Sequence, residues 1–261
     1  MKIRNLLLSL AILGAPAGTA HATLLGRDLN GSADTFEAYY DTVLDITWLA
    51  DANFAQTSGH DADGRMSWQD ANAWAAGLSF TDGTRVYDNW RLPTVMPIDG
   101  VALNPVFSTD GSTDGGYNVS APGSAFANRI GGEMAFMYYN NLGNPGYFNV
   151  AGQWSGCYVS SSNTCLDNTG PFQNLQADIY WTNLEYAQNT VSGWAFGMND
   201  GNQLAGNFKG NAYYAWAVSS GDIAAPVPEA DTRAMLLSGL GLMAYRVSRR
   251  RAGSAIASTT R

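Results

Sequence analysis

Short hydrophobic segments separated by polar turns make up most of this chain. After residue 22 the sequence is rich in Gly, Asn, Asp, Ser and aromatic residues, and long stretches with helical spacing are rare. Such a pattern predicts short elements joined by many turns. The segment TVLDITWLAD at 42–51 has the composition of a strand, although its alternation is imperfect.

Two segments show the spacing of an amphipathic helix. In SWQDANAWAAGL at 67–78, Ser67 can cap the helix and Asp70 follows three residues later. The expected buried face consists of Trp68, Ala71, Ala75 and Leu78. GGEMAFMYYNNLG at 131–143 predicts a second helix that ends at Gly143. Its expected inner side is formed by Met134, Met137, Tyr138 and Asn141.

The C-terminal half predicts strands. In SGWAFGMNDGNQLAGNFK at 192–209, apolar residues alternate before Asp200-Gly201, a dipeptide typical of hairpin turns. NAYYAWAVSS at 211–220 alternates as a single closing strand would. Two early helices and a late antiparallel sheet together predict an α+β fold.

The N-terminus has the features of a secretory signal peptide. Lys2 and Arg4 precede a short apolar run from 6 to 14, and Ala20-His21-Ala22 fits a cleavage site. Residues 1–22 are therefore expected to be removed, which leaves Thr23 as the first mature residue. An N-terminal membrane anchor is the alternative, but the apolar run is short for a span.

Charge excludes one class of partner. Of the 14 basic residues only six lie between 23 and 230, against 21 acidic residues, so this part carries a net charge of −15. A nucleic-acid surface needs a basic footprint, so we expect no nucleic-acid partner. The acidic balance is compatible with secretion and with divalent cations.

The two cysteines, Cys157 and Cys165, are close in sequence. Export places them in an oxidising compartment, where a disulfide closing a small loop is expected and would add about 2.5 kcal/mol of stability. Two free thiols are the alternative. A metal site at the cysteines is disfavoured, because His60 is the one histidine after residue 22.

Several segments resemble the WRLP-box secreted domains, the Lcl C-terminal domain family. They follow one another as ITWLADAN, GRMSWQDANAWAAGL, DNWRLPT, GEMAFMYYNNLGN, YWTNLE and AWAVSSGD, over residues 40 to 222. The resemblance implies a C-type-lectin-like domain over 23–222. Its box is formed by Trp90, Arg91, Leu92 and Pro93. Arg91 is expected to bind carbonyls or a carboxylate within the fold, with ligand binding as the alternative.

An Asp-rich turn and a single histidine are further candidates for a metal or catalytic site. Asp61 and Asp63, two residues apart before Gly64, have the opening spacing of many calcium loops, but no Glu follows at the distal position. A solvated turn is the favoured interpretation, with calcium as the alternative; Asp110 and Asp114 would be further ligands. His60 is expected to be an exposed bystander, since no nucleophile motif accompanies it. We therefore expect no enzymatic activity.

Aromatic residues are dense in the C-terminal half. Exposed rings there would stack on sugar faces, while alternation predicts that about half of them point into the core. The candidates are Trp154, Trp181, Trp194, Trp216, Tyr147, Tyr180, Tyr213 and Tyr214.

The C-terminal segment combines a short apolar helix with a basic cluster. The 12 apolar or small residues of 234–245 reach about 18 Å as a helix, short of a hydrocarbon core of about 30 Å, so the expected transmembrane helix is marginal. The basic residues Arg246, Arg249, Arg250 and Arg251 would hold that end in the cytoplasm, with the body outside.

This segment resembles the PEP-CTERM sorting signal of Gram-negative envelope proteins. Val227, Pro228 and Glu229 precede the helix, and Ala230 stands where the family has a second proline. The resemblance implies an exosortase partner that cuts at this motif, and transient inner-membrane attachment. The expected divisions are a signal peptide at 1–22, the domain at 23–222, the sorting segment at 223–251 and a tail at 252–261.

The sequence thus predicts an exported envelope or extracellular binding protein that associates with extracellular polysaccharide. A structural or protein-binding module of the biofilm matrix, and a calcium-dependent adhesin, are the alternatives.

Overall fold

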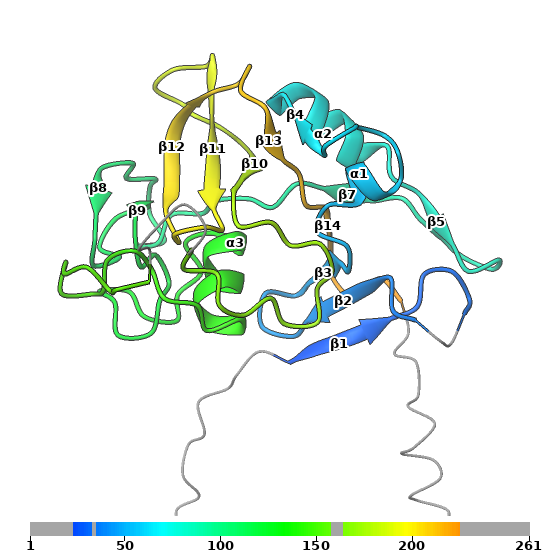
Figure 1. Cartoon of the computed structure of the whole chain (residues 1–261), viewed down its shortest axis with the longest axis horizontal. Helices are drawn as coiled ribbons and strands as arrows, with labels where there is room; N and C mark the ends of the chain where they lie inside the picture. Colours follow the sequence, from blue (N-terminus) through cyan, green and yellow to red (C-terminus); the bar gives the residue numbers. More distant parts are fainter. Residues whose placement is uncertain (1–22, 33–34, 158–163, 225–261) are drawn as a thin grey trace, which may run out of the picture.

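The computed structural model describes residues 23–32, 35–157 and 164–224, and the strands of this part form three sheets (Figure 1). The first has the order β1-β2-β3-β14-β7 and the second β4-β13-β10-β11-β12-β9-β8, while β5 and β6 form a separate hairpin. Helices are few and short in the described part, so the fold is mainly β.

The five-stranded sheet joins the two described ends of the body. It contains β1 (Leu24–Arg27), β2 (Ala38–Asp41), β3 (Ile46–Leu49), β14 (Val218–Ser220) and β7 (Trp90–Arg91), all antiparallel to their neighbours. Arg27 is buried and binds Asp222 through two hydrogen bonds of 2.6 and 2.7 Å. β14, the last described strand, lies between β3 and β7 in the sheet whose edge strand is β1.

The seven-stranded sheet carries the predicted hairpin. It contains β4 (Arg65–Met66), β13 (Tyr213–Tyr214), β10 (Ile179–Glu185), β11 (Ser192–Gly197), β12 (Gln203–Phe208), β9 (Gly115–Gly116) and β8 (Phe107–Ser108). β11 and β12 are antiparallel and Gly201 in their turn has φ +81°, which confirms the hairpin prediction. The pairs β10–β13 and β8–β9 are parallel. The hairpin of β5 (Phe80–Thr81) and β6 (Val86–Tyr87) stands apart.

Both predicted helices are present. α2 (Trp68–Ala76) begins after Ser67, whose hydroxyl accepts the backbone N–H of Asp70, as the capping pattern predicts. α3 (Glu133–Phe136) continues into the π-helix η1 (Met137–Asn141), and residues 133–139 are buried on every side. A further short helix, α1 (Phe54–Thr57), precedes the Asp-rich turn.

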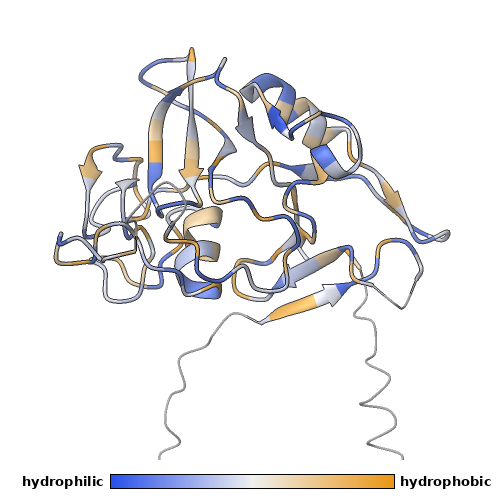
Figure 2. Ribbon diagram, viewed as in Figure 1, coloured by the Kyte–Doolittle hydropathy of each residue, from blue (hydrophilic) through white to orange (hydrophobic). Residues whose placement is uncertain are grey.

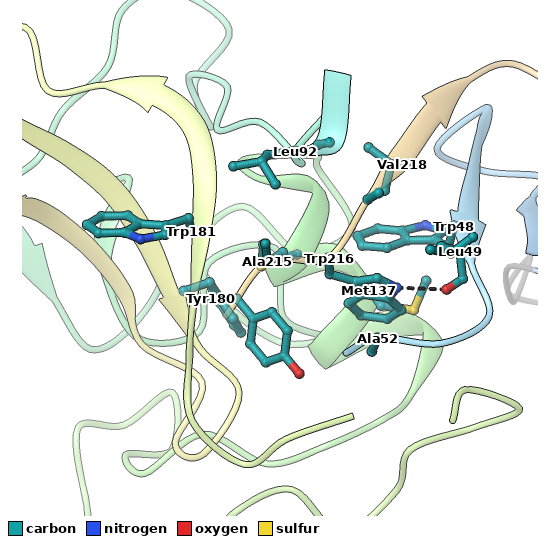
Figure 3. Close-up of a cluster of buried hydrophobic side chains, with 14 of the residues drawn as sticks. Trp48, Leu49, Ala52, Leu92, Met137, Tyr180, Trp181, Ala215, Trp216 and Val218 are labelled. Carbon is teal, nitrogen blue, oxygen red and sulfur yellow. Dashed lines mark hydrogen bonds between the residues drawn. The ribbon is translucent and has the colours of Figure 1, made fainter. Parts of the chain in front are cut away.

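Aromatic side chains fill the core between the sheets (Figure 3). The rings of Trp48 and Trp216 lie 4.5 Å apart, and Phe172 packs edge-on against Trp216 at 4.7 Å. The buried indole of Trp216 donates to the carbonyl of Leu49 at 2.8 Å, and that of Trp181 donates to Met66 at 2.9 Å. These two indoles therefore contribute apolar burial with their N–H groups satisfied, whereas the buried N–H of Trp48 has no acceptor among the described residues.

The expectation of one closing strand over 211–220 is wrong. The segment pairs first as β13 in one sheet and then as β14 in the other. Between them, the three residues Ala215, Trp216 and Ala217 are all fully buried, because the chain crosses the core from sheet to sheet (Figure 3). Alternation cannot continue where both faces of the chain are covered.

The prediction of an α+β, C-type-lectin-like fold with a C-terminal hydrophobic helix is also wrong. The described helices of four, nine and four residues do not form a layer, and three sheets dominate. Many strands have only two residues, which is too short to show a period in the sequence. The two amphipathic segments are the clearest local signals, so the sequence pattern overstates the helical content of the fold. Within the described part, no helix has the length and apolar character needed to cross a membrane. The expected signal peptide, the sorting motif, and the segment 234–245 with the arginines that follow it lie outside the described residues.

Candidate functional site

Four aromatic rings pack together at the end of the molecule where β8 lies, and the backbone of Trp154 pairs with that of one of them. We call these five residues the aromatic cluster: Phe107, Tyr117, Tyr147, Phe148 and Trp154. Tyr117 is central, with ring distances of 5.9 Å to Phe107, 6.1 Å to Tyr147 and 5.3 Å to Phe148. Phe148 pairs with Trp154 through a β-bridge. Figure 2 shows the hydrophobic colour of β8 at this edge of the molecule.

Two of these rings face solvent. Phe107 is 59% exposed and Trp154 is 53% exposed, whereas Tyr117, which packs against Phe107, is buried. Exposed rings of this size beside packed aromatic residues are candidates for contact with a ligand.

Glycines allow β8 and β9 to approach closely. A Cβ on Gly116, which has φ +103°, would lie 2.0 Å from the carbonyl oxygen of Ser108. No other residue fits there without moving the backbone. The resulting parallel pair holds Phe107 one strand away from Tyr117, which immediately follows β9.

Asn118 fixes the loop that carries Trp154. Its amide nitrogen donates to the carbonyls of Thr109 and Phe148 at 2.7 and 2.8 Å. Beyond Phe148, the side chain of Asn149 accepts the backbone N–H groups of Ala151 and Gln153. Trp154 therefore directly follows an ordered turn.

A buried acid and a phenol lie beneath the cluster. The hydroxyl of Tyr117 donates to Asp200 at 3.1 Å. Burial raises the pKa of Asp200 above the ordinary carboxyl value, and burial beside this carboxylate raises the pKa of Tyr117 as well. The phenol is neutral at physiological pH and serves as a donor.

The predicted disulfide is present. Cys157 and Cys165 are joined, with their Cα atoms 4.9 Å apart. The backbone N–H of Cys165 donates to Asn199 and its carbonyl accepts the hydroxyl of Tyr138. The bridge thus ties the end of the Trp154 loop to the β11–β12 turn.

Half of the eight aromatic candidates belong to the core. Trp181, Trp194, Trp216 and Tyr180 are fully buried, so they cannot meet a sugar. Tyr213 and Tyr214 are half-buried on β13 and pack against Trp181 and Tyr180 respectively. Of the eight candidates, the cluster contains Trp154 and Tyr147.

The WRLP box holds the two sheets and α3 together. Arg91 binds Glu133 through paired hydrogen bonds of 2.7 and 2.8 Å and also donates to the carbonyl of Leu92. Trp90 and Leu92 are buried, and the carbonyl of Pro93 accepts the backbone N–H of Asn183. Both terminal nitrogens of the Arg91 guanidinium therefore donate to internal acceptors.

A second concave region lies between α1 and α2, and we call it the α1–α2 groove. It has a volume of about 760 Å³, and Asp61 and His60 stand on its rim. Asp61 accepts the backbone N–H groups of Asp63 and Gly64, and Asp63 accepts that of Arg65, so both carboxylates cap their own turn. Hydrogen bonds from these N–H groups, that of Asp63 first, lower the pKa of Asp61.

The structure does not assemble the calcium site. Asp114 is buried and accepts the N–H groups of Ile98 and Asn104, beside β9 at the far end from α1 (Figure 1). Asp110, which follows β8, accepts Ser112 N–H in the same region. Across the residues that the structure describes, no three His, Cys, Asp or Glu side chains gather as metal ligands.

Phe107, Tyr117, Phe148 and Trp74 were missed by sequence reasoning. The first lies in a Gly/Ser/Asp-rich segment, where an isolated phenylalanine among turn residues was the available signal. Trp74 lines the groove. It lies seven residues after Ser67 and four after Asp70, within the predicted helix, but the expected buried face does not include it.

Comparison with known proteins identifies the C-terminal segment. Residues 226–251 match the family model of the PEP-CTERM protein-sorting motif. No curated protein and no solved structure matches the chain, and nothing in these comparisons supports the resemblance of residues 40 to 222 to the Lcl family. The chain carries a PEP-CTERM sorting motif, and it is therefore an exported protein that an exosortase sorts at the cell envelope.

Proposed function

We propose that this exported protein binds extracellular polysaccharide through the aromatic cluster. The observation that carries the proposal is the pair of exposed rings, Phe107, which packs against Tyr117, and Trp154, whose backbone is bridged to that of Phe148. The C–H faces of sugar rings stack on such surfaces, and adjacent polar groups accept or donate to hydroxyls. Asn149 and Gln153 offer amide groups on the same turn.

Charge narrows the class of polysaccharide. The body between 23 and 230 carries a net charge of −15, which repels polyanionic chains at moderate ionic strength. Neutral or amine-bearing chains are the expected ligands. Binding of neutral chains is carried by stacking, so it is expected to change little with salt.

Truncation of the exposed rings tests this site. Trp154→Ala and Phe107→Ala are each expected to weaken binding to the neutral exopolysaccharide of a producing strain about tenfold, as loss of an aromatic anchor does. Affinity electrophoresis of the exported protein in polysaccharide-containing gels measures the change. Phe208→Ala is the matched control, because Phe208 is 61% exposed on β12 and has no ring contact with the cluster.

Unchanged retention of both cluster variants would contradict the proposal. Specific capture of protein partners together with no retention by any exopolysaccharide would favour a matrix module that binds protein. Binding that appears only with added calcium would favour the adhesin alternative.

The sorting segment completes the proposed function. The apolar segment at 234–245 would hold the protein at the inner membrane for a short time, with the arginines at 246–251 on the cytoplasmic side. Exosortase cleavage at Pro228-Glu229 would then free the body to join the polysaccharide outside the cell. The body is proposed to bind without catalysis, with His60 exposed and outside the aromatic cluster.

A further inference from the structure

The turn that follows β1 carries an acceptor pattern for N-linked sugars. Asn30-Gly31-Ser32 has the form Asn-x-Ser, with a middle residue that is not proline. Such a pattern acts only in an exported protein, where a sugar can be joined to the asparagine amide. This condition is met here, because the chain carries an envelope-sorting motif. The sequence contains one other match, Asn118-Val119-Ser120.

The two matches differ in whether an enzyme can reach the amide nitrogen. Asn118 is only 4% exposed, and its amide nitrogen donates to the carbonyls of Thr109 and Phe148. Both of its amide hydrogens are therefore used inside the fold. Asn30 and Gly31 are exposed. In the folded body, the structure thus leaves Asn30 as the accessible acceptor.

Local hydrogen bonds hold the first pattern as a short turn. The side chain of Asp28 accepts the backbone N–H groups of Asn30 and Gly31 at 2.9 and 2.7 Å. Gly31 has φ +80°, a conformation that suits glycine. The side-chain oxygen of Asn30 then accepts the backbone N–H of Ser32 at 2.7 Å, so the amide is folded back toward the serine.

The amide nitrogen of Asn30 can carry a sugar without loss of its contact in the fold. It donates to a carboxylate oxygen of Glu37 at 2.7 Å, and the other oxygen of Glu37 accepts the backbone N–H of Leu29. An amide nitrogen has two hydrogens. Replacement of one by a sugar leaves the other for Glu37.

We propose that Asn30 is glycosylated after export. The donor is an oligosaccharide joined through a diphosphate to a membrane lipid, and an oligosaccharyltransferase of the producing cell brings it to the turn. A bond forms between the side-chain nitrogen of Asn30 and C1 of the first sugar, while the bond from C1 to the diphosphate oxygen breaks. The lipid diphosphate leaves with the electron pair, and a base of the transferase takes the proton from the nitrogen.

This site is separate from the aromatic cluster. The connection between β1 and β2 lies at the opposite end of the molecule from β8 (Figure 1). A glycan on Asn30 would therefore leave Phe107 and Trp154 uncovered. The inference does not depend on the proposed function, and Asn30→Gln should be retained by neutral exopolysaccharide as the wild type is.

Mass spectrometry of peptides from the protein recovered from a producing strain tests the proposal. Cleavage after arginine separates the two patterns into the peptides 28–65 and 92–129. The first is expected to carry added mass that fragments as sugar, and the second to have its unmodified mass. Asn30→Gln removes the acceptor nitrogen, so the added mass should be lost.

Ser32→Ala and Ser32→Thr form a matched pair. Both keep Asn30, and they differ in the hydroxyl that the acceptor pattern requires. The added mass should be lost in Ser32→Ala and retained in Ser32→Thr, which also separates loss of the pattern from a disturbed turn. An unmodified wild-type peptide 28–65, or added mass that persists in Ser32→Ala, would overturn the proposal. Equal modification of peptide 92–129 would show that exposure does not select the acceptor.

Discussion

Arg27 is a buried cation whose charge is balanced by one partner. Its guanidinium makes two hydrogen bonds to Asp222, donates a third to the carbonyl of Gly26, and lies 5.3 Å from the ring of Tyr40. Desolvation of a charge is costly, and the carboxylate offsets that cost while it remains ionised.

Removal of this carboxylate should therefore destabilise the body. Asp222→Asn is expected to lower the free energy of unfolding by about 2 kcal/mol, because it leaves the buried guanidinium facing a neutral group. Urea denaturation measures the loss. Asp45→Asn, an exposed change that keeps an acceptor for Tyr40, should stay within about 0.5 kcal/mol. Equal effects of the two substitutions would contradict this role for the ion pair.

Ionisation of Asp200 should lower the free energy of unfolding as pH rises. Burial raises its folded pKa above the ordinary value of 3.8, so its favourable contribution is complete below pH 3.8 and is lost as pH rises through the raised pKa. Asp200→Asn keeps an acceptor for Asn202 N–H and removes the buried charge. The variant should have a higher Tm than the wild type at neutral pH, and the difference should vanish near pH 3. A variant that is less stable at neutral pH would contradict the sign.

At the scale of elements, local signals were sufficient for α2 and for the β11–β12 hairpin. Ser67 caps its helix and Asp200-Gly201 makes its turn through contacts within a few residues. The two-residue strands and the crossing at Trp216 depend on partners far along the chain, so no local pattern encodes them.

Some residues of the candidate site can be recognised from the local sequence, whereas others are brought to it only by the fold. Trp154 and Tyr147 were recognised because they are aromatic residues in a loop-rich half. Phe107 and Tyr117 join them only because β8 and β9 pair and because Asn118 ties their loop to Phe148. Likewise, the groove forms where the Asp-rich turn packs beside α2, which spacing alone does not show.

At the scale of the whole molecule, sorting and binding are assigned to separate parts. The folded body reaches the buried Ala224, and the sorting motif begins at 226. Cleavage within the motif would leave every contact among the described residues intact. Release from the membrane should therefore not alter the binding surface.

Mass spectrometry of the protein recovered from a producing strain checks the two cleavages. We expect a chain that begins at Thr23 and ends near Pro228-Glu229, smaller than the 27.9 kDa translation product. Glu229→Ala should leave the C-terminal segment attached, because it removes the acidic residue that directly follows Pro228, while Glu185→Ala in the body should be processed normally. A wild-type mass that includes residues 234–251 would show that Ala230 prevents cleavage.

The contact between Trp154 and polysaccharide can be measured directly by fluorescence. All eight tryptophans are described, and Trp154 alone is exposed, so acrylamide quenching of the exported protein reports mainly on this ring. Saturating neutral exopolysaccharide should protect Trp154 from acrylamide and reduce the accessible fraction of the emission, with no change in Trp154→Phe. Quenching that is unaffected by polysaccharide, under conditions in which the two bind, would show that the aromatic cluster is not the binding surface.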